Sequence, residues 1–111
     1  MGLDQFAYTK REDEADNFAE WRKHPNLEGW MRQLWESQGN SGEFNIEEVE
    51  LTLEDIEHLQ KDILNKNLPT TGGFFFGSNS DEYYFEYDLE FCAKAKECLS
   101  NQQRVYYSSW W

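Results

Sequence analysis

Two stretches of this chain contain no acidic residue, although acidic residues are frequent in the rest of it. Asp and Glu account for 22 of 111 residues, yet residues 63–80 and 98–111 contain neither. Both stretches are rich in aromatic residues and in glycine or serine, and they include Phe74-Phe75-Phe76 and Tyr106-Tyr107. A chain that keeps negative charge out of its most aromatic segments is expected to bury them in a core or to present them as a recognition surface.

The length indicates one domain with its own core. A chain of 111 residues buries about two-thirds of its extended surface without metal or disulfide support. No apolar run approaches the roughly 20 residues of a membrane span, and the first residues lack the basic and apolar segments of a signal peptide. Cys92 and Cys98 lie in one predicted helix and are expected to be reduced thiols. We therefore expect an intracellular, soluble protein without membrane contact.

The formal net charge of -12 limits the kinds of partner. Binding to a nucleic-acid backbone requires Lys and Arg side chains that replace counterions, so direct nucleic-acid binding is not expected. Negative charge favours solubility, and it also attracts basic surfaces of partner proteins.

Apolar residues recur near helical spacing in several parts of the chain. Together with start and stop signals, they predict a first turn or short helix over residues 17–23 and three main helices over residues 25–37, 52–67 and 88–99. Pro25 suits the first position of a helix, and Gly39 suits a stop. Thr52 and Asp55 resemble a capping box, and Asp88 is the predicted cap of the last helix.

Three segments have the composition of strands: residues 43–51, 74–76 and 104–110. The first breaks its alternation midway, which indicates a bulge or a short strand. The last two are expected to pair with each other. Residues 1–16 are dense in charge and are expected to be loosely ordered. The predicted fold is a single α+β domain over residues 1–111, with three helices packed on a small, mainly antiparallel sheet.

Trp21, Arg22, Lys23 and His24 form the only compact basic cluster of the sequence. Together with Trp30 they suit a phosphate or carboxylate that lies beside a stacked ring. The alternative is a solvated helix end, where cations face the negative end of the helix dipole.

The glycine-rich segment around Phe76 and Ser78 is a second candidate ligand site. Glycines let backbone amides approach an anion, and hydroxyl groups add donors. However, no Lys follows as in a P-loop, and the G-x-G-x-x-G spacing is absent. The alternative is a turn that leads into a core strand.

Residues 106–111 are a third candidate site. Alternation along a strand places Tyr106 and Trp110 on one face and Ser109 on the other. One face would pack, while the other would stack on a base or on a side chain of a partner. Packing of both faces without a ligand is the alternative.

Catalytic signatures are lacking in the sequence. His24 and His58 are the only histidines, and neither has the spacing of a metal ligand. There is no nucleophile elbow and no Cys–His signature, and 22 acidic residues produce adjacent carboxylates by chance. No catalytic residue, metal or cofactor is expected.

Three stretches together resemble a family of small, functionally uncharacterised proteins of tailed phages. They are residues 21–31, with Trp-Arg-Lys and Gly-Trp-Met; residues 68–78, with Leu-Pro-Thr and Gly-Phe-Phe-Phe-Gly-Ser; and residues 106–110, Tyr-Tyr-Ser-Ser-Trp. The likeness spans residues 18–111. Many members have a histidine where this chain has Glu28, so no histidine role is carried over to that position. Some relatives are labelled phosphoglycerate kinase; that kinase needs two large domains, which this chain is too short to form.

The resemblance implies a phage or prophage origin, with the host cytoplasm as the location, and no established activity. We expect a non-enzymatic binding protein that modulates the host by capturing a small molecule or a host protein. One alternative is sequestration of a small nucleotide signal of host defence. Another is an acidic mimic that blocks a host protein which binds nucleic acid.

Overall fold

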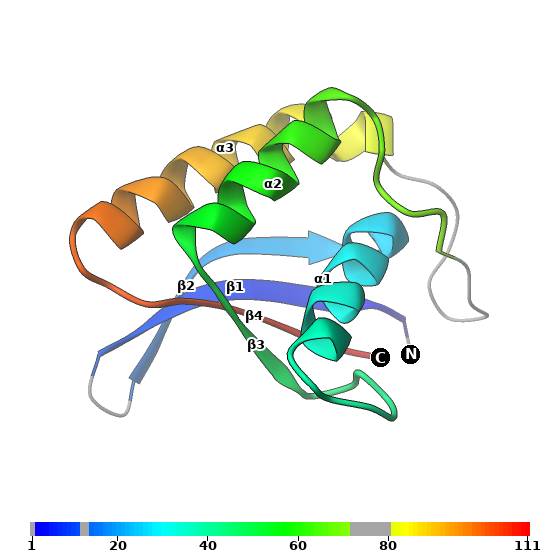
Figure 1. Ribbon diagram of the computed structural model, residues 1–111, viewed down its shortest axis with the longest axis horizontal. Coiled ribbons are helices and arrows are strands. Elements are labelled where there is room, and N and C mark those ends of the chain that lie inside the picture. Colours follow the sequence, from blue (N-terminus) through cyan, green and yellow to red (C-terminus); the bar gives the residue numbers. More distant parts are fainter. Residues whose placement is uncertain (1, 12–13, 72–80) are drawn as a thin grey trace.

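The computed structural model describes residues 2–11, 14–71 and 81–111. The elements are β1 (Asp4–Arg11), β2 (Glu14–Arg22), α1 (Pro25–Ser37), β3 (Glu48–Leu51), α2 (Leu53–Leu64), α3 (Asp81–Ser100) and β4 (Val105–Trp110). The strands form an antiparallel sheet in the order β2-β1-β4-β3, and the helices lie on one side of it (Figure 1). The predicted α+β class, with three helices on a small antiparallel sheet, is confirmed.

The amino-terminal part of the chain is a β-hairpin. β1 pairs with β2 along its whole length, from Asp4 opposite Arg22 to Arg11 opposite Glu14. Residues 4–11 and 14–16 are therefore ordered as strands and not loose as predicted, and the predicted turn or short helix over residues 17–23 is wrong. Side chains of β1 alternate between a buried and a more exposed face. The buried face includes polar residues, which hides the period of two in the sequence.

A bulge in β2 explains why this strand resembled a helix. The register shifts between Ala7 and Tyr8 of β1, which leaves Phe18 of β2 as the extra residue. Because the bulge resets the alternation, Phe18 and Trp21 both pack against the ring of Phe91 on α3. Their spacing of three positions thus arises within a strand.

β4 occupies the middle of the sheet. It pairs with β1 over residues 105–110 and with β3 over residues 105–108. The predicted alternation is confirmed, because Tyr107 and Ser109 are buried while Trp110 is exposed on the other face. Residues 74–76 lie outside the described residues. Their expected pairing with β4 therefore stays a prediction, and the described partners of β4 are β1 and β3.

The two helices with clear start signals lie close to where they were predicted. α1 begins at Pro25 and buries Leu27, Met31 and Trp35. α2 begins after Thr52, whose hydroxyl accepts a hydrogen bond from the backbone of Asp55, while the Asp55 side chain accepts one from the backbone of Thr52. The predicted capping box is confirmed, and α2 ends a few residues earlier than expected.

The third predicted helix starts earlier than the sequence indicated. α3 begins at Asp81, so Asp88 does not cap it and instead lies buried in its second turn, on the same face as Cys92 and Ala95. Cys92 and Cys98 both lie in α3 and are free thiols. The sequence around Asp88 therefore does not distinguish an acidic residue that caps a helix from one that is buried on a face of the helix.

The predicted strand over residues 43–51 is reduced to β3. Phe44 is buried, but the backbone of Ile46 has a φ of 59° and interrupts the strand. A left-handed conformation costs about 1–2 kcal/mol for a residue with a side chain, and it is rare for β-branched residues. The Ile46 side chain is nevertheless 71% exposed, so burial does not compensate for this cost.

Gly29 allows the segment after α2 to approach α1 closely. A Cβ at Gly29 would lie 1.8 Å from Thr71 Oγ1 and 2.9 Å from Thr71 Cβ. We expect Gly29→Ala to lower the free energy of unfolding by about 1–3 kcal/mol through overpacking, in spite of the better helix propensity of alanine.

Thr71→Gly is the matched change, because it removes the atoms that the new methyl group would meet. Urea unfolding of both single variants and of the double variant should therefore give a coupling energy of about 1 kcal/mol or more. Additive effects of the two substitutions would contradict the close approach.

Candidate functional site: a buried polar network beneath a cavity

A buried carboxylate connects α3 with the end of β2. Asp88 Oδ1 accepts a hydrogen bond from Trp21 Nε1 at 2.8 Å, and Asp88 Oδ2 lies 2.7 Å from His24 Nε2. His24 is fully buried and stacks on the ring of Tyr84 with 4.8 Å between the centroids. Its other nitrogen, Nδ1, lies 3.8 Å from Asp81 Oδ1. The imidazole therefore lies between two carboxylates of α3, and Asp88 is the one within hydrogen-bond distance.

Gln5 joins this pair to the middle of the sheet. Its side chain accepts a hydrogen bond from the backbone N–H of His24 at 2.9 Å and donates one to the carbonyl of His24 at 3.0 Å. The amide also donates to the hydroxyl of Tyr107 at 2.8 Å. The side chain thus satisfies the backbone where β2 ends and α1 begins, which buried polar groups require.

A second buried carboxylate continues the network. Glu28 of α1 is 2% exposed and accepts hydrogen bonds from the hydroxyls of Tyr107 and Ser109, each at 2.7 Å. The polar groups of five elements, β1, β2, α1, α3 and β4, are therefore linked through the core. Such a network fixes one arrangement of the core when all its members are bonded.

Burial changes the acidity of this network. Burial raises the pKa of Glu28, and the hydrogen bonds from Tyr107 and Ser109 offset only part of the shift. Burial also raises the pKa of Tyr107 well above its usual value, and the Glu28 carboxylate adds to the effect. Burial and then the charge of Asp88 raise the pKa of the Cys92 thiol to about 12. Cys92 is therefore protonated at neutral pH and a poor nucleophile.

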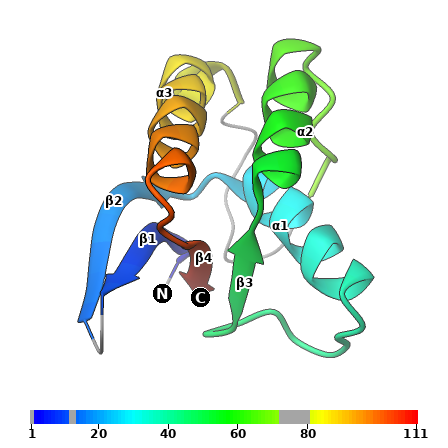
Figure 2. The same cartoon turned by 60° about the vertical axis from the view of Figure 1, so that its left-hand side comes forward.

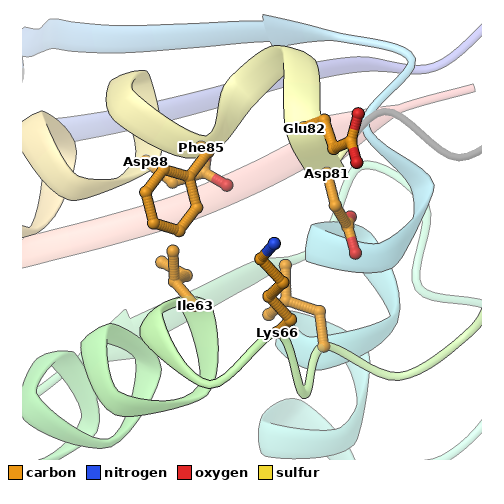
Figure 3. A pocket seen from close by; sticks show the side chains of 7 residues that line it. Ile63, Lys66, Asp81, Glu82, Phe85 and Asp88 are labelled. Carbon is orange, nitrogen blue, oxygen red and sulfur yellow. The ribbon is translucent and has the colours of Figure 1, made fainter.

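A cavity of about 470 Å³ opens between the end of α2 and the start of α3, with Asp88 in its wall (Figure 3). The described residues that line it are Ile63, Lys66, Leu68, Asp81, Glu82, Phe85 and Asp88. In Figure 3, Lys66 extends from the end of α2 towards α3. Helix α3 supplies the three carboxylates of the lining and also the ring of Phe85. This volume is within the range of small-molecule sites.

The cavity combines apolar walls with an excess of negative charge. Ile63, Leu68 and Phe85 are apolar, and the lining contains three carboxylates but one amino group. No ion pair of Lys66 is found within the described part of the chain. A site of this composition attracts a cationic group that carries an aliphatic or aromatic body.

The structure separates the residues of the predicted basic cluster. Trp21 and His24 are buried in the network around Asp88, whereas the Arg22 side chain is exposed and lies 3.8 Å from Asp4. Lys23 is exposed, next to Arg22. Trp30 belongs to another region, because its Nε1 donates to Asp62 at 2.9 Å.

The remaining predicted site residues lie in three places. Phe76 and Ser78 lie outside the described residues. Ser109 faces inwards to Glu28, while Tyr106 and Trp110 lie on the outer face of the sheet. Their role in ligand binding stays a prediction.

Sequence reasoning did not select Gln5, Glu28 or Asp88. A signal for the two acidic residues was present, because each shares the buried stripe of its helix: Glu28 with Met31 and Trp35, and Asp88 with Cys92 and Ala95. A carboxylate on an apolar stripe indicates a buried, hydrogen-bonded group.

Within the ranges that the structure covers, no group of three His, Cys, Asp or Glu side chains is arranged to hold a metal ion. None of the helices in these ranges has the length and apolar character needed to cross a membrane. Comparisons with models of protein families, with curated proteins and with solved structures found no match.

Proposed function

We propose that the protein is a phage-encoded, non-enzymatic binding protein that captures a small organic cation in the cavity between α2 and α3, and so modulates the host. The observation that carries the proposal is the lining of the cavity, which brings Asp81, Glu82 and Asp88 together over apolar walls. An aliphatic amine fits this combination, since its charged end pairs with carboxylates and its chain replaces water on the walls.

The network beneath the cavity supports binding by a prepared site. Both oxygens of Asp88 are already held by Trp21 and His24, so the carboxylate does not need to be ordered when a ligand arrives. A site that is ordered in advance loses less conformational entropy on binding.

The burial of the network supports a structural role for its titratable groups. His24 and Tyr107 are fully buried; His24 Nε2 is engaged by Asp88, and the Tyr107 hydroxyl is engaged by Gln5 and Glu28. A general acid or base must come within hydrogen-bond reach of a substrate. This arrangement favours ligand capture over catalysis.

A nucleotide is the main competitor as the ligand. Its phosphates would require cations, and Lys66 is the single cation among the described residues of the lining. An acidic mimic would use the net charge of -12 against a basic protein, and its affinity would fall steeply with salt.

Binding of 1,4-diaminobutane tests the proposal, with succinate as an anionic ligand of similar length. We expect the diamine to bind and to raise the melting temperature by mass action, while succinate does neither. Tryptophan fluorescence should report binding, because the indole of Trp21 donates a hydrogen bond to Asp88, which lies in the cavity wall.

Two variants should change diamine affinity in opposite directions. Glu82→Gln should weaken binding by up to about fivefold and Lys66→Ala should strengthen it by a similar factor, because a charge pair near the surface contributes about 0.2–1 kcal/mol. Glu86→Gln is the matched control, since Glu86 lies on the same helix and is exposed away from the lining. Preferential binding of succinate or of a nucleotide, or weaker diamine binding by Lys66→Ala, would contradict capture of a cation.

A further inference from the structure

The helices cover one face of the sheet, and no described element covers the other (Figure 2). On this open face, Trp110 is 63% exposed and Ile46 is 71% exposed. A hollow of about 370 Å³ lies beside them and is lined by Phe6, Ile46, Ser108, Ser109 and Trp110. Exposed apolar surface of this kind marks interaction sites in soluble proteins.

The open face is also where positive and negative side chains are paired. Three ion pairs join Lys or Arg to a carboxylate among the residues with described positions, and all three lie on this face: Lys10–Glu48 at 2.8 Å, Arg22–Asp4 at 3.8 Å and Arg104–Glu50 at 3.7 Å. They surround the aromatic side chains, and Lys10 also lies over the ring of Tyr106, 4.5 Å from its centroid. Glu20, opposite Phe6 on the same face, adds one negative charge, so the open face carries only a small part of the net charge of -12.

This distribution of charge identifies the kind of partner. A basic protein would be attracted to the acidic surfaces of the molecule, and it would gain little from a face whose charges are mostly paired. A second copy of the chain carries the same negative charge, so its acidic surfaces are repelled. The open face is the surface on which two copies can meet with the least repulsion.

Ile46 adds an independent reason to treat this face as a contact surface. It adopts a left-handed backbone conformation that is rare for a β-branched residue, and its side chain projects into solvent at the rim of the hollow. Its backbone N–H donates to the Ser109 carbonyl at 2.8 Å, which fixes it beside β4. Unfavourable backbone conformations of this kind are concentrated at functional sites.

We propose that two copies of the chain associate through their open faces about a two-fold axis, with Trp110 of each copy in the hollow of the other. Such an isologous contact requires a surface that fits itself, and an exposed ring beside an apolar hollow provides one. At the usual strand spacing and rise, the face measures about 20 by 20 Å, or roughly 800 Å² over the two copies, which is below the size of standard specific interfaces and predicts a weak, concentration-dependent dimer. The surface lies across the sheet from the cavity, so this dimer does not depend on the proposed ligand.

Sedimentation equilibrium of the full chain at several concentrations tests this dimer, with 0.05 M and 0.5 M NaCl as the two conditions. We expect association to strengthen by about fivefold or more at the higher salt, because salt screens the repulsion between two copies of the same charge. Trp110→Ser should weaken association by about tenfold or more, since it removes the ring that fills the hollow.

The variant Ile46→Asn distinguishes an effect on association from an effect on the stability of the monomer. Asparagine tolerates the left-handed conformation better than isoleucine, so the dilute monomer should melt at a higher temperature while association weakens. Tyr83→Ser is the control, because Tyr83 is 82% exposed on α3, away from the open face, and the variant should associate like the wild type. The proposal is overturned if the wild type stays monomeric at millimolar concentration in 0.5 M NaCl, if salt weakens its association, or if Tyr83→Ser weakens association as much as Trp110→Ser.

Discussion

Replacement of Asp88 by alanine is expected to lower the free energy of unfolding by about 3–5 kcal/mol, as the loss of one partner of a buried charged network does. The Asp88 side chain is 2% exposed, and its two oxygens satisfy Trp21 Nε1 and His24 Nε2. Alanine would leave both ring groups buried without this acceptor, and each such loss costs about 1–3 kcal/mol. Urea unfolding at pH 7 measures the change as a lower midpoint at an unchanged slope.

Asp88→Asn is the control for this prediction, because it keeps the shape of the side chain and one oxygen acceptor. It should destabilise the protein clearly less than Asp88→Ala. Phenylalanine at position 21 removes the indole donor, so the Trp21→Phe and Asp88→Ala pair should be strongly non-additive. A loss below about 1 kcal/mol for Asp88→Ala, the size of a surface effect, would mean that the network does not hold α3 to β2.

Replacement of Glu28 by alanine should have the second largest effect on the free energy of unfolding. Glu28→Ala should lower this free energy at neutral pH, whereas Glu28→Gln should not. Glu28→Ala removes the acceptor of two buried hydroxyls, Tyr107 and Ser109, and is expected to cost about 2–4 kcal/mol at pH 7. Glu28→Gln keeps the volume of the side chain and buries no charge, because the amide is neutral. The Ser109 hydroxyl can rotate to accept a hydrogen bond from the new amide group. The Glu28→Gln variant should therefore match or exceed the wild type in stability at pH 7.

The dependence on pH follows from the raised pKa of Glu28. The folded state holds its proton to a higher pH than the unfolded state, so folding binds a proton in the window between the two pKa values. The stabilisation by Glu28 is full below its unfolded pKa of about 4.3 and is lost as the pH rises through the folded value. The melting temperature of the wild type minus that of Glu28→Gln should fall from pH 4 to pH 8. A difference that is constant or rises with pH would contradict the raised pKa.

Local signals were sufficient for two of the three helices. Pro25 at the first position of α1, and Thr52 with Asp55 before α2, act through backbone groups of their own turn. Such signals lie within a few residues of each other, so the sequence alone reveals them. The hairpin of β1 and β2 was missed because Gln5 stands among the buried residues of β1, and a bulge changed the alternation of β2.

The buried network depends on residues far apart in the sequence. Asp88 is 67 positions from Trp21, and Tyr107 is 79 positions from Glu28. No window of a few residues shows that such groups meet, so Asp88 was interpreted as a helix cap. The same limit applies to the cavity, because its charge results from packing the end of α2 against the start of α3.

The position of β4 has a consequence for the order of folding. β1 and β4 are the two central strands, and Asp4 pairs with Trp110 across the sheet. During synthesis, β1 therefore leaves the ribosome long before β4 does. Until then, the hairpin of β1 and β2 has an unpaired edge along β1. Contacts of such large sequence separation slow folding, and a bare edge can pair with other chains in the meantime. The risk of mispairing is therefore greatest in the interval before β4 is synthesised.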